Sequence, residues 1–446
     1  MKNISIYLIV LVSIFIISCQ NEKGKSVTII GEDSATMSAI AELKGEYENQ
    51  TGVKVNLVAL PFEEALEKSN LDLSEGTALY DIILQYNFSL SSFVRNDYVY
   101  SLDELTKYVS KEELNFENDL FQADWEEVGY YYKDFKNPSL GKAKVGYPFA
   151  SNTMLLVYNK AMFNDEINKT NYKEKFGKEL VPPTNWEDFR NIASFFTNKD
   201  KNQFGVCVEG AEGGWLYYQW VNMLFGMDGK VMDKERGWEG DVDTKVLLDT
   251  PQGIETMKYF ESLREFNRGS FFDIDMYTQK ELMKEGNVAM SLMWSDILYN
   301  LIDLEKGKES QFGFAPIPGN KSINAGGAYF VNKQSEHSEE AMKFIAWLMQ
   351  EDNQIKMIKN GLCSPRKGAY DAESVQHIPY LKALKTSLER GVYMAEAGPD
   401  ADLINQTITK YAQRVWRNEL EPEEAMKLMQ NEVEEGRKEI FSAINK

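Results

Sequence analysis

The sequence predicts two α/β lobes joined by a hinge that the chain crosses three times. Its 446 residues exceed the roughly 250 to 300 at which one hydrophobic core stops growing, so two lobes are expected. Residues 26–59 alternate strand, helix and strand patterns, which is how a parallel sheet begins. The run 145–160 joins a polar, bend-prone segment to a buried-strand pattern and is typical of a strand that passes between lobes.

The first lobe opens with a βαβ unit. Residues 26–31 form a β-branched strand, residues 37–47 place apolar side chains at helical spacing, and residues 53–59 form a second strand. Residues 82–84 are continuously apolar, as in a strand that is buried on both faces of a parallel sheet. The polar residues 85–87 follow at the carboxyl end of this strand, which is where open α/β sheets bind ligands.

The second lobe follows the first crossing. Thr184–Glu187 has the pattern of a capping box and predicts a helix start, and residues 204–208 predict a strand. Thr250–Pro251 opens another helix, with proline in its first turn. The strand predicted over 287–292 delivers residues 293–296 to its end. These elements alternate in the order expected for a second α/β lobe.

Two further crossings make both lobes discontinuous. Residues 312–318 form a strand that ends in alternating prolines and leaves its sheet, and residues 328–331 then return to the first lobe. Residues 362–366 form the third crossing, after which helices run to the C-terminus in the second lobe. The predicted boundaries are 26–148 with 319–364 for the first lobe, and 149–318 with 365–446 for the second.

The N-terminus has the pattern of an export signal. A short basic start precedes the apolar stretch 4–17, which is too short to span a bilayer as a mature helix. Residues 16–19 resemble the lipobox of bacterial lipoproteins, which implies a signal peptide over 1–18, a lipid-bearing Cys19 and a polar tether over 19–25. The alternative is an ordinary secretory signal with a chance cysteine. We therefore expect a protein that is anchored to the outer face of the cytoplasmic membrane.

Charge and cysteine content exclude several classes of function. A formal net charge of −20 repels nucleic acids and anionic lipid headgroups. Cys207 and Cys363 fit no CxxC pattern, so two buried free thiols are favoured over a disulfide. The histidines, His337 and His377, lie in polar surroundings and form no metal motif. We expect no metal, no cofactor and no nucleic-acid partner.

The order and spacing of several short motifs carry a resemblance. They are YDIIL, GYPFASNTMLLVYNK, PPTNWEDF, EGNVAM with a following Trp, FGFAPIPG, and GGAYFV before an amphipathic helix. Together the motifs resemble extracellular solute-binding protein family 1, the maltodextrin and sugar-binding type that serves ABC importers. The resemblance implies a type II periplasmic-binding-protein-like fold, a sugar or oligosaccharide ligand, ABC permease subunits as partners, a monomer, and no catalysis. The sequence departs from that pattern at residues 85–89 and at Asn152, which leaves the identity of the sugar open.

A sugar site needs aromatic rings for the C–H face and planar polar groups for the hydroxyls. By resemblance, Trp294 is a stacking platform, with an ordinary core tryptophan as the alternative. Asp33 is alternatively a helix cap, and Arg366 alternatively pairs with an acid. The candidate ligand-binding residues are Asp33, Gln85, Tyr86, Asn152, Trp215, Trp294, Asp296, Gly327, Tyr329 and Arg366.

Three other functions stay open from the sequence alone. A carbohydrate-active enzyme could use a carboxylate pair, because such pairs carry no local motif. A non-sugar cargo such as ferric ion could be held by phenolates, although Tyr217 and Tyr218 are neighbours on a predicted helix and face different directions. The third alternative is a surface interaction lipoprotein with no role in transport.

Overall fold

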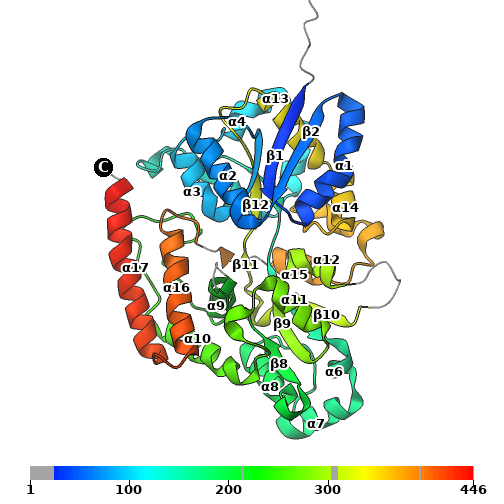
Figure 1. The fold of residues 1–446 in the computed structure, drawn as a ribbon, viewed down its shortest axis with the longest axis vertical. Coiled ribbons are helices and arrows are strands. Elements are labelled where there is room, and N and C mark those ends of the chain that lie inside the picture. Colours follow the sequence, from blue (N-terminus) through cyan, green and yellow to red (C-terminus); the bar gives the residue numbers. More distant parts are fainter. Residues whose placement is uncertain (1–24, 212–214, 303–309, 391–392, 395, 445–446) are drawn as a thin grey trace, which may run out of the picture.

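The computed structural model describes residues 25–211, 215–302, 310–390, 393–394 and 396–444. Two lobes, each built on its own sheet, follow one another along the long axis of the molecule (Figure 1). The predicted signal peptide, Cys19 and nearly all of the tether lie outside the described residues. None of the described helices combines the length and the apolar composition needed to cross a bilayer.

The sheet of the first lobe has the strand order β2-β1-β3-β12-β6. The first three strands run parallel, whereas β12 is antiparallel to both β3 and β6. Strand β12, which lies between β3 and β6, comes from far along the chain, so this lobe is discontinuous in sequence. Its strands are β1 (Ser26–Glu32), β2 (Lys54–Leu60), β3 (Ile82–Tyr86), β6 (Tyr147–Ala150) and β12 (Gly327–Val331), and its larger helices are α1 (Ala35–Thr51), α2 (Phe62–Glu75), α3 (Asn87–Arg95), α13 (Ser338–Leu348) and α14 (Glu351–Lys359).

The sheet of the second lobe has the strand order β10-β7-β9-β8. Its apolar side chains form one continuous core with the helices around it. The strands are β7 (Met154–Asn159), β8 (Phe204–Cys207), β9 (Val288–Trp294) and β10 (Phe312–Pro316), and the helices include α6 (Lys160–Asn164), α7 (Glu166–Phe176), α8 (Trp186–Phe196), α9 (Trp215–Gly226), α10 (Pro251–Ser262), α11 (Met276–Lys284), α12 (Leu298–Leu301), α15 (Leu381–Glu389), α16 (Ala401–Trp416) and α17 (Pro422–Ile444).

The chain segments between the lobes are hydrogen-bonded to one another. The Ser151 amide donates to the Cys363 carbonyl at 2.8 Å, and the Ala325 amide donates to the Asn152 carbonyl at 2.8 Å. A buried carboxylate also ties two of these segments together, since Asp124 accepts from the Ser151 hydroxyl and, at 2.6 Å, from the Asn324 amide. The three segments therefore form one compact hinge rather than three loose linkers.

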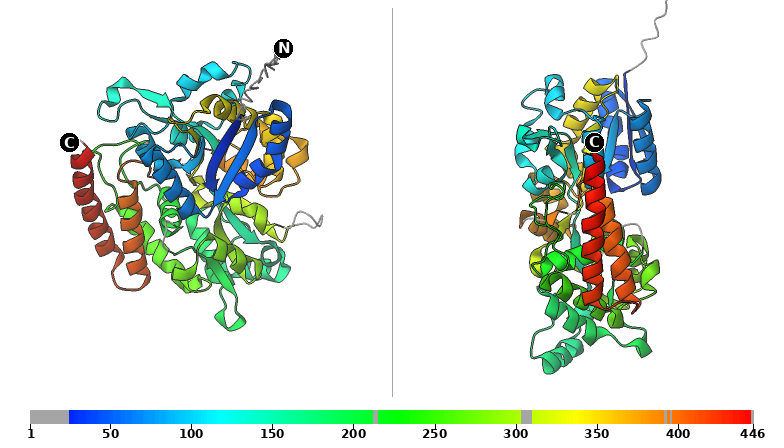
Figure 2. Two further views of the ribbon diagram at one scale, coloured as in Figure 1. Left: turned by 45° about the horizontal axis from the view of Figure 1, so that its top comes forward. Right: turned by 90° about the vertical axis from the view of Figure 1, so that its left-hand side faces the viewer.

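A second attachment joins the lobes away from this hinge. Trp238 lies in the loop between α9 and α10 of the second lobe, yet its side chain is fully buried in a first-lobe cluster. Its indole nitrogen donates to the Glu126 carbonyl at 2.6 Å, and its ring packs against Tyr131 and Tyr132. The helices α16 and α17 lie side by side along one side of the molecule (Figure 2). Phe441, near the C-terminal end of α17, stacks on first-lobe Phe135.

Local differences from the sequence predictions have simple causes. Strand β9 continues to Trp294 rather than ending at residue 292, because Met154 and Leu155 of β7 pair with its last two residues. Asn185, not Thr184, caps α8, and its side chain accepts from the Asp188 amide. Thr250 caps α10 as predicted. Cys207 and Cys363 are both buried and free, which confirms the favoured interpretation of these thiols.

Candidate ligand-binding cleft

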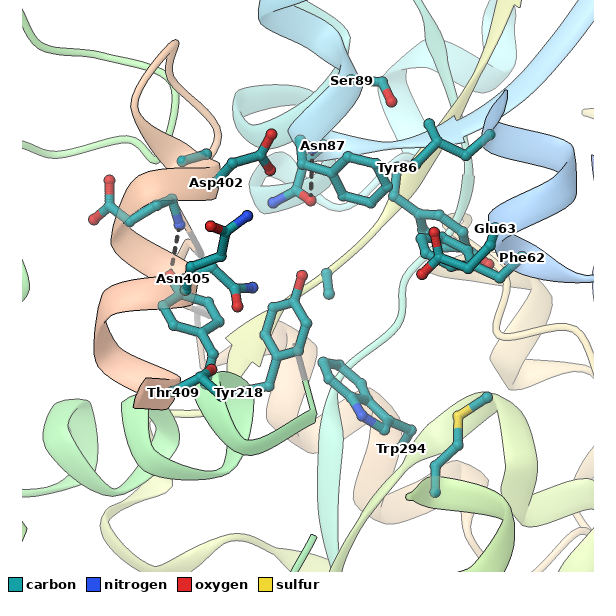
Figure 3. A pocket seen from close by; sticks show the side chains of 18 of the residues that line it. Phe62, Glu63, Tyr86, Asn87, Ser89, Tyr218, Trp294, Asp402, Asn405 and Thr409 are labelled. Atoms are coloured by element: carbon teal, nitrogen blue, oxygen red, sulfur yellow. Dashed lines mark hydrogen bonds between the residues drawn. The ribbon is translucent and has the colours of Figure 1, made fainter. Parts of the chain in front are cut away.

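A cavity of about 990 Å³ lies between the lobes and draws its walls from both. The first lobe contributes the end of β1, the start of α2 and the segment from the end of β3 into α3. The second lobe contributes the end of β9, the start of α9 and one face of α16, and Asn152 of the hinge completes the wall. Figure 3 shows these side chains converging on one space from opposite sides.

The second-lobe floor of the cleft is aromatic. Trp294 ends β9, and its ring meets Tyr218 of α9 edge to face, with centroids 5.1 Å apart. Only 3% of Trp294 is exposed, and its indole nitrogen has no hydrogen-bond partner among the described residues. Aromatic pairs of this geometry hold each other in place. A ligand that enters the cleft therefore meets two fixed rings (Figure 3).

The first-lobe wall holds a second aromatic group. The rings of Phe62, Tyr86 and Phe88 lie within 6.3 Å of one another, centroid to centroid. The Tyr86 hydroxyl donates to the Glu32 carboxylate at 2.5 Å, which fixes both side chains. Burial, above all, raises the pKa of Glu32. This arrangement places a carboxylate directly beside aromatic rings.

A second carboxylate enters from the other lobe. Asp296 follows Trp294 at the end of β9, and its Oδ1 atom has no hydrogen-bond partner among the described residues. Burial, reinforced by the negative charge of Glu32, raises the pKa of Asp296 to about 7. The hinge residue Asn152 lies beside it and accepts from the Ser295 hydroxyl at 2.9 Å. The cleft thus brings one carboxylate from each lobe into the same electrostatic environment.

The face of α16 forms a polar wall. Helical spacing brings onto one face the residues Asp402, Asn405, Gln406, Thr409 and Gln413, all of which line the cavity. The side-chain amide of Gln413 donates to the Gly210 carbonyl at 3.2 Å and holds the helix to the second lobe. Amide and hydroxyl groups at this spacing offer both donors and acceptors to a ligand.

Of the residues selected from the sequence, the cavity brings together Tyr86, Asn152, Trp294 and Asp296. Gln85 is buried in β3, because its side chain points to the opposite face of the strand from Tyr86. Asp33 is exposed and lies outside the cavity wall, where its neighbour Glu32 stands instead. The backbone of Trp215 begins α9, and its side chain lies outside the described part of the structure.

The structure places the other three candidates in structural roles. Tyr329 is fully buried in the first-lobe core, against Phe149. A Cβ atom at Gly327 would lie 2.5 Å from the Phe149 ring, so this glycine permits close packing of strands and does not line the cavity. Arg366 is only 8% exposed, pairs with Asp119 at 2.9 Å and donates to the Met349 carbonyl. Of its two predicted roles, the structure shows the pairing with an acid.

Several cavity residues escaped the sequence analysis. Glu32 was missed because β1 extends one residue beyond the predicted strand, and Tyr218 was read only as a possible iron ligand. The partner required for that reading, Tyr217, is buried, and its hydroxyl accepts from the Glu396 amide. No group of three or more His, Cys, Asp or Glu residues in the described part of the chain is arranged to hold a metal ion. Other cavity residues that were not predicted carry no local motif, and they include Phe62, Glu63, Phe88, Met276 and Thr409.

The chain matches known proteins over most of its length. The family model for bacterial extracellular solute-binding proteins matches residues 42–383. A relative from Sinorhizobium fredii, named as a probable amino-acid ABC transporter periplasmic-binding protein, is 22% identical over 415 residues and covers 92% of this chain and 89% of its own.

Solved structures show the same fold. An ABC transporter solute-binding protein of Agrobacterium radiobacter K84, in complex with ribitol, has a TM-score of 0.75 at 20% identity and covers 92% of this chain and 98% of its own. One from Thermotoga lettingae TMO, bound with α-D-tagatose, has a TM-score of 0.74 at 20% identity and covers 92% of this chain and 99% of its own. The predicted fold class is confirmed.

Proposed function

The chain belongs to the bacterial extracellular solute-binding proteins, and from this premise we propose that its cleft captures a sugar, a polyol or a short oligosaccharide for an ABC permease. The resemblance noted in the sequence is thereby confirmed at the level of the family. The ligands named for the two similar structures, ribitol and tagatose, support a polyhydroxylated ligand here.

The observation that carries this proposal is the pairing of aromatic and planar polar groups across one cavity. Trp294 and Tyr218 offer ring faces for the C–H surface of a sugar, and Asn152 and Asn405 offer amides for its hydroxyls. These residues come from the hinge and the second lobe, while Tyr86 and Phe88 come from the first. A bound ligand that touches all of them bridges the two lobes.

Bridging explains how binding is signalled to the permease. A ligand that contacts both walls stabilises the closed arrangement of the lobes over the open one. Shifting the population from mostly open to mostly closed requires a differential affinity of about 5.5 kcal/mol. Several hydrogen bonds, at about 1 kcal/mol each, and two stacked rings provide a free energy of this size. The permease then recognises the closed form.

The finer parts of the proposal concern the cell envelope. The sequence pattern at residues 16–19 supports lipid attachment at Cys19, with residues 19–25 as a tether to the outer face of the cytoplasmic membrane. We further propose that the protein acts as a monomer and performs no catalysis. Metabolic labelling with a palmitate analogue tests the anchor, since a Cys19→Ser variant is expected to lose the label and to be released from membranes.

Carbohydrate hydrolysis is the second candidate, because Glu32 and Asp296 place one carboxylate on each side of the cleft. Product analysis after long incubation with oligosaccharides tests this alternative. Cleavage products that disappear in a Glu32→Gln variant would establish an enzyme, whereas intact substrate supports a binding protein.

The main test is a titration of the full mature protein with a panel of monosaccharides, polyols and oligosaccharides, followed by tryptophan fluorescence and calorimetry. We expect at least one member to bind with a Kd in the micromolar range or below and to change the fluorescence, because Trp294 lies in the cavity wall. Small-angle scattering of the same complex is expected to show a smaller radius of gyration than the empty protein. Binding by no member of the panel would contradict the proposal.

A further inference from the structure

The charge of the cleft is distributed unevenly. At the end formed by the hinge and the aromatic rings, the acidic wall residues are Glu32, Glu63 and Asp296, and no described lysine or arginine lines this end. The basic wall residues, Lys410, Arg414 and Arg417, lie near the C-terminal end of α16. We call the region around Glu32, Tyr86, Trp294 and Asp296 the acidic end of the cleft.

The bases at the far end are already engaged. Lys410 pairs with Glu432 at 2.6 Å, Arg414 lies 3.7 Å from Glu419, and the Arg417 guanidinium lies 4.1 Å from the Phe272 ring centroid. In contrast, the negative charges at the acidic end of the cleft are not neutralised by described basic side chains. Among the described residues, neither Glu32 nor Asp296 has a basic partner, and the hydrogen bond to Glu32 comes from the neutral Tyr86 hydroxyl.

These two carboxylates belong to different lobes, so closure affects them together. Glu32 ends β1 of the first lobe and Asp296 follows β9 of the second. Closing the cleft removes water from both and strengthens their mutual repulsion, since Coulomb energy rises as the effective dielectric constant falls. A neutral ligand leaves this repulsion uncompensated. A positive charge placed between the carboxylates turns the same desolvation into an attraction.

The rings around the acidic end suit a cation as well. The rings of Tyr86 and Trp294 line the same region as the two carboxylates. An ammonium group over an aromatic face gains about 0.5 to 2 kcal/mol, and more where water is excluded. Two polar atoms of this wall, Asp296 Oδ1 and the indole nitrogen of the buried Trp294 side chain, are left without partners in the described structure and can therefore bond to a ligand group.

We propose that the acidic end of the cleft binds a protonated amine of the ligand between Glu32 and Asp296, so that the ligand class is an amino sugar or an amino polyol. The proposal rests on the proposed function and sharpens it. The hydroxyls of the same ligand contact Asn152 and the polar face of α16, and anionic sugars such as uronates are rejected. The net charge of −20 attracts the same class of ligand at a distance.

The first test compares ligands that share one skeleton. The disaccharide probes are cellobiose, the β-1,4 dimer of glucosamine, its di-N-acetyl derivative, and a β-1,4 disaccharide that contains glucuronate. The corresponding monosaccharides are also compared, as is an amino polyol with the neutral polyol of the same skeleton. Calorimetry at pH 8 and low ionic strength is chosen because Asp296, with a pKa of about 7, is then mostly ionised, while the alkyl amine of an amino polyol is still protonated.

We expect the amine to bind at least tenfold more tightly than the matched neutral compound, and the acetylated and uronate compounds to bind more weakly than the amine. Equal or tighter binding of the neutral member overturns the inference and leaves the proposed function intact. Binding by no member of any pair overturns both.

The second test removes the charges while keeping the shapes. Glu32→Gln and Asp296→Asn are each expected to weaken binding of the amine at least tenfold, and by a clearly larger factor than they weaken binding of the neutral compound. Asp33→Asn is the matched control, because Asp33 carries the same charge next to Glu32 but lies outside the cavity wall. It is expected to change either affinity less than twofold.

Circular dichroism and thermal unfolding of each variant identify any loss of folding. Should one variant fail to fold, the other still tests the proposal. An equal loss of affinity for amine and neutral compounds in a folded variant would contradict the proposal, because it would show that the carboxylates only accept hydrogen bonds from ligand hydroxyls.

Discussion

At the scale of single residues, some side chains of the cleft both pack in the hydrophobic core and line the cavity. Trp294 is part of the second-lobe core and also faces the cavity. Truncating a buried tryptophan to alanine costs about 3 to 5 kcal/mol because it leaves a void. A loss of sugar affinity in such a variant would therefore mix binding with stability.

Trp294→Phe is the cleaner change, and we predict that it weakens ligand binding about five- to twentyfold. The smaller ring keeps most of the packing against Tyr218 but loses contact area and the unpartnered indole N–H. Thermal unfolding of the empty protein is expected to shift by only a few degrees. Trp347→Phe is the control, because Trp347 belongs to α13 of the first lobe and does not line the cavity, so this change should leave affinity unchanged.

Asp124 leads to a prediction about pH. Burial raises the pKa of this carboxyl from 3.8 to about 7, although hydrogen bonds from Ser151 and Asn324 oppose the shift. The folded state thus holds a proton that the unfolded state has released, so stability falls as pH rises from about 4 to about 7. An Asp124→Asn variant stays neutral and lacks this slope.

We predict that the Asp124→Asn variant gains about 2 kcal/mol of unfolding free energy relative to the wild type between pH 5 and pH 7.5. Urea unfolding at the two pH values measures this difference. A difference that does not change with pH would show that the carboxyl is ionised in the folded protein throughout that range.

At the scale of elements, the strands were easier to predict than the walls of the cleft. Strands such as β1 and β3 are recognisable in the sequence as β-branched and continuous apolar runs, because buried strands need apolar side chains. The wall on α16 carries no such signal, since Asn405 and Thr409 are exposed-type residues whose role depends on where the helix docks. The crossings were predictable from their prolines and glycines, whereas the loop that carries Trp238 was not.

The position of α16 gives a prediction at this scale. Asn405 lines the cavity, and its side chain makes no hydrogen bond to another described residue that the substitution would remove. Asn405→Ala is therefore expected to weaken sugar binding roughly three- to tenfold, as one hydrogen bond contributes about 0.5 to 1.5 kcal/mol. Stability should change by less than about 0.5 kcal/mol. Calorimetry measures the affinity, and Glu435→Ala, at an exposed position of α17, is the control. An unchanged affinity in Asn405→Ala would show that Asn405 does not contact the ligand.

At the scale of the whole molecule, the lobes share more than a hinge. Trp238 of the second lobe is buried among Tyr131 and Tyr132 of the first, and ion pairs join Lys142 to Glu239 and Arg236 to Glu126 around it. This second attachment is expected to stabilise the contact between the lobes more than exposed ion pairs alone would, because it buries the whole side chain of a tryptophan.

We predict that Trp238→Ala lowers the unfolding free energy by about 3 to 5 kcal/mol. It should also broaden the distribution of inter-lobe distances, measured by spin labels placed on α2 and α10. The control is Trp347→Ala, which removes a partly buried ring within a single lobe and should destabilise the protein without broadening that distribution. Equal broadening of the inter-lobe distances in the two variants would show that Trp238 does not hold the lobes together.

Two rigid bodies that are fastened at two separate places can turn only about the line that joins those places. The hinge segments around Asn152 and the buried indole of Trp238 are two such fastenings. Both restrict the relative motion of the lobes, so we expect opening and closing to be mainly a rotation about an axis that passes close to them. A ligand that arrives from outside would then meet the two walls in one preferred mutual orientation.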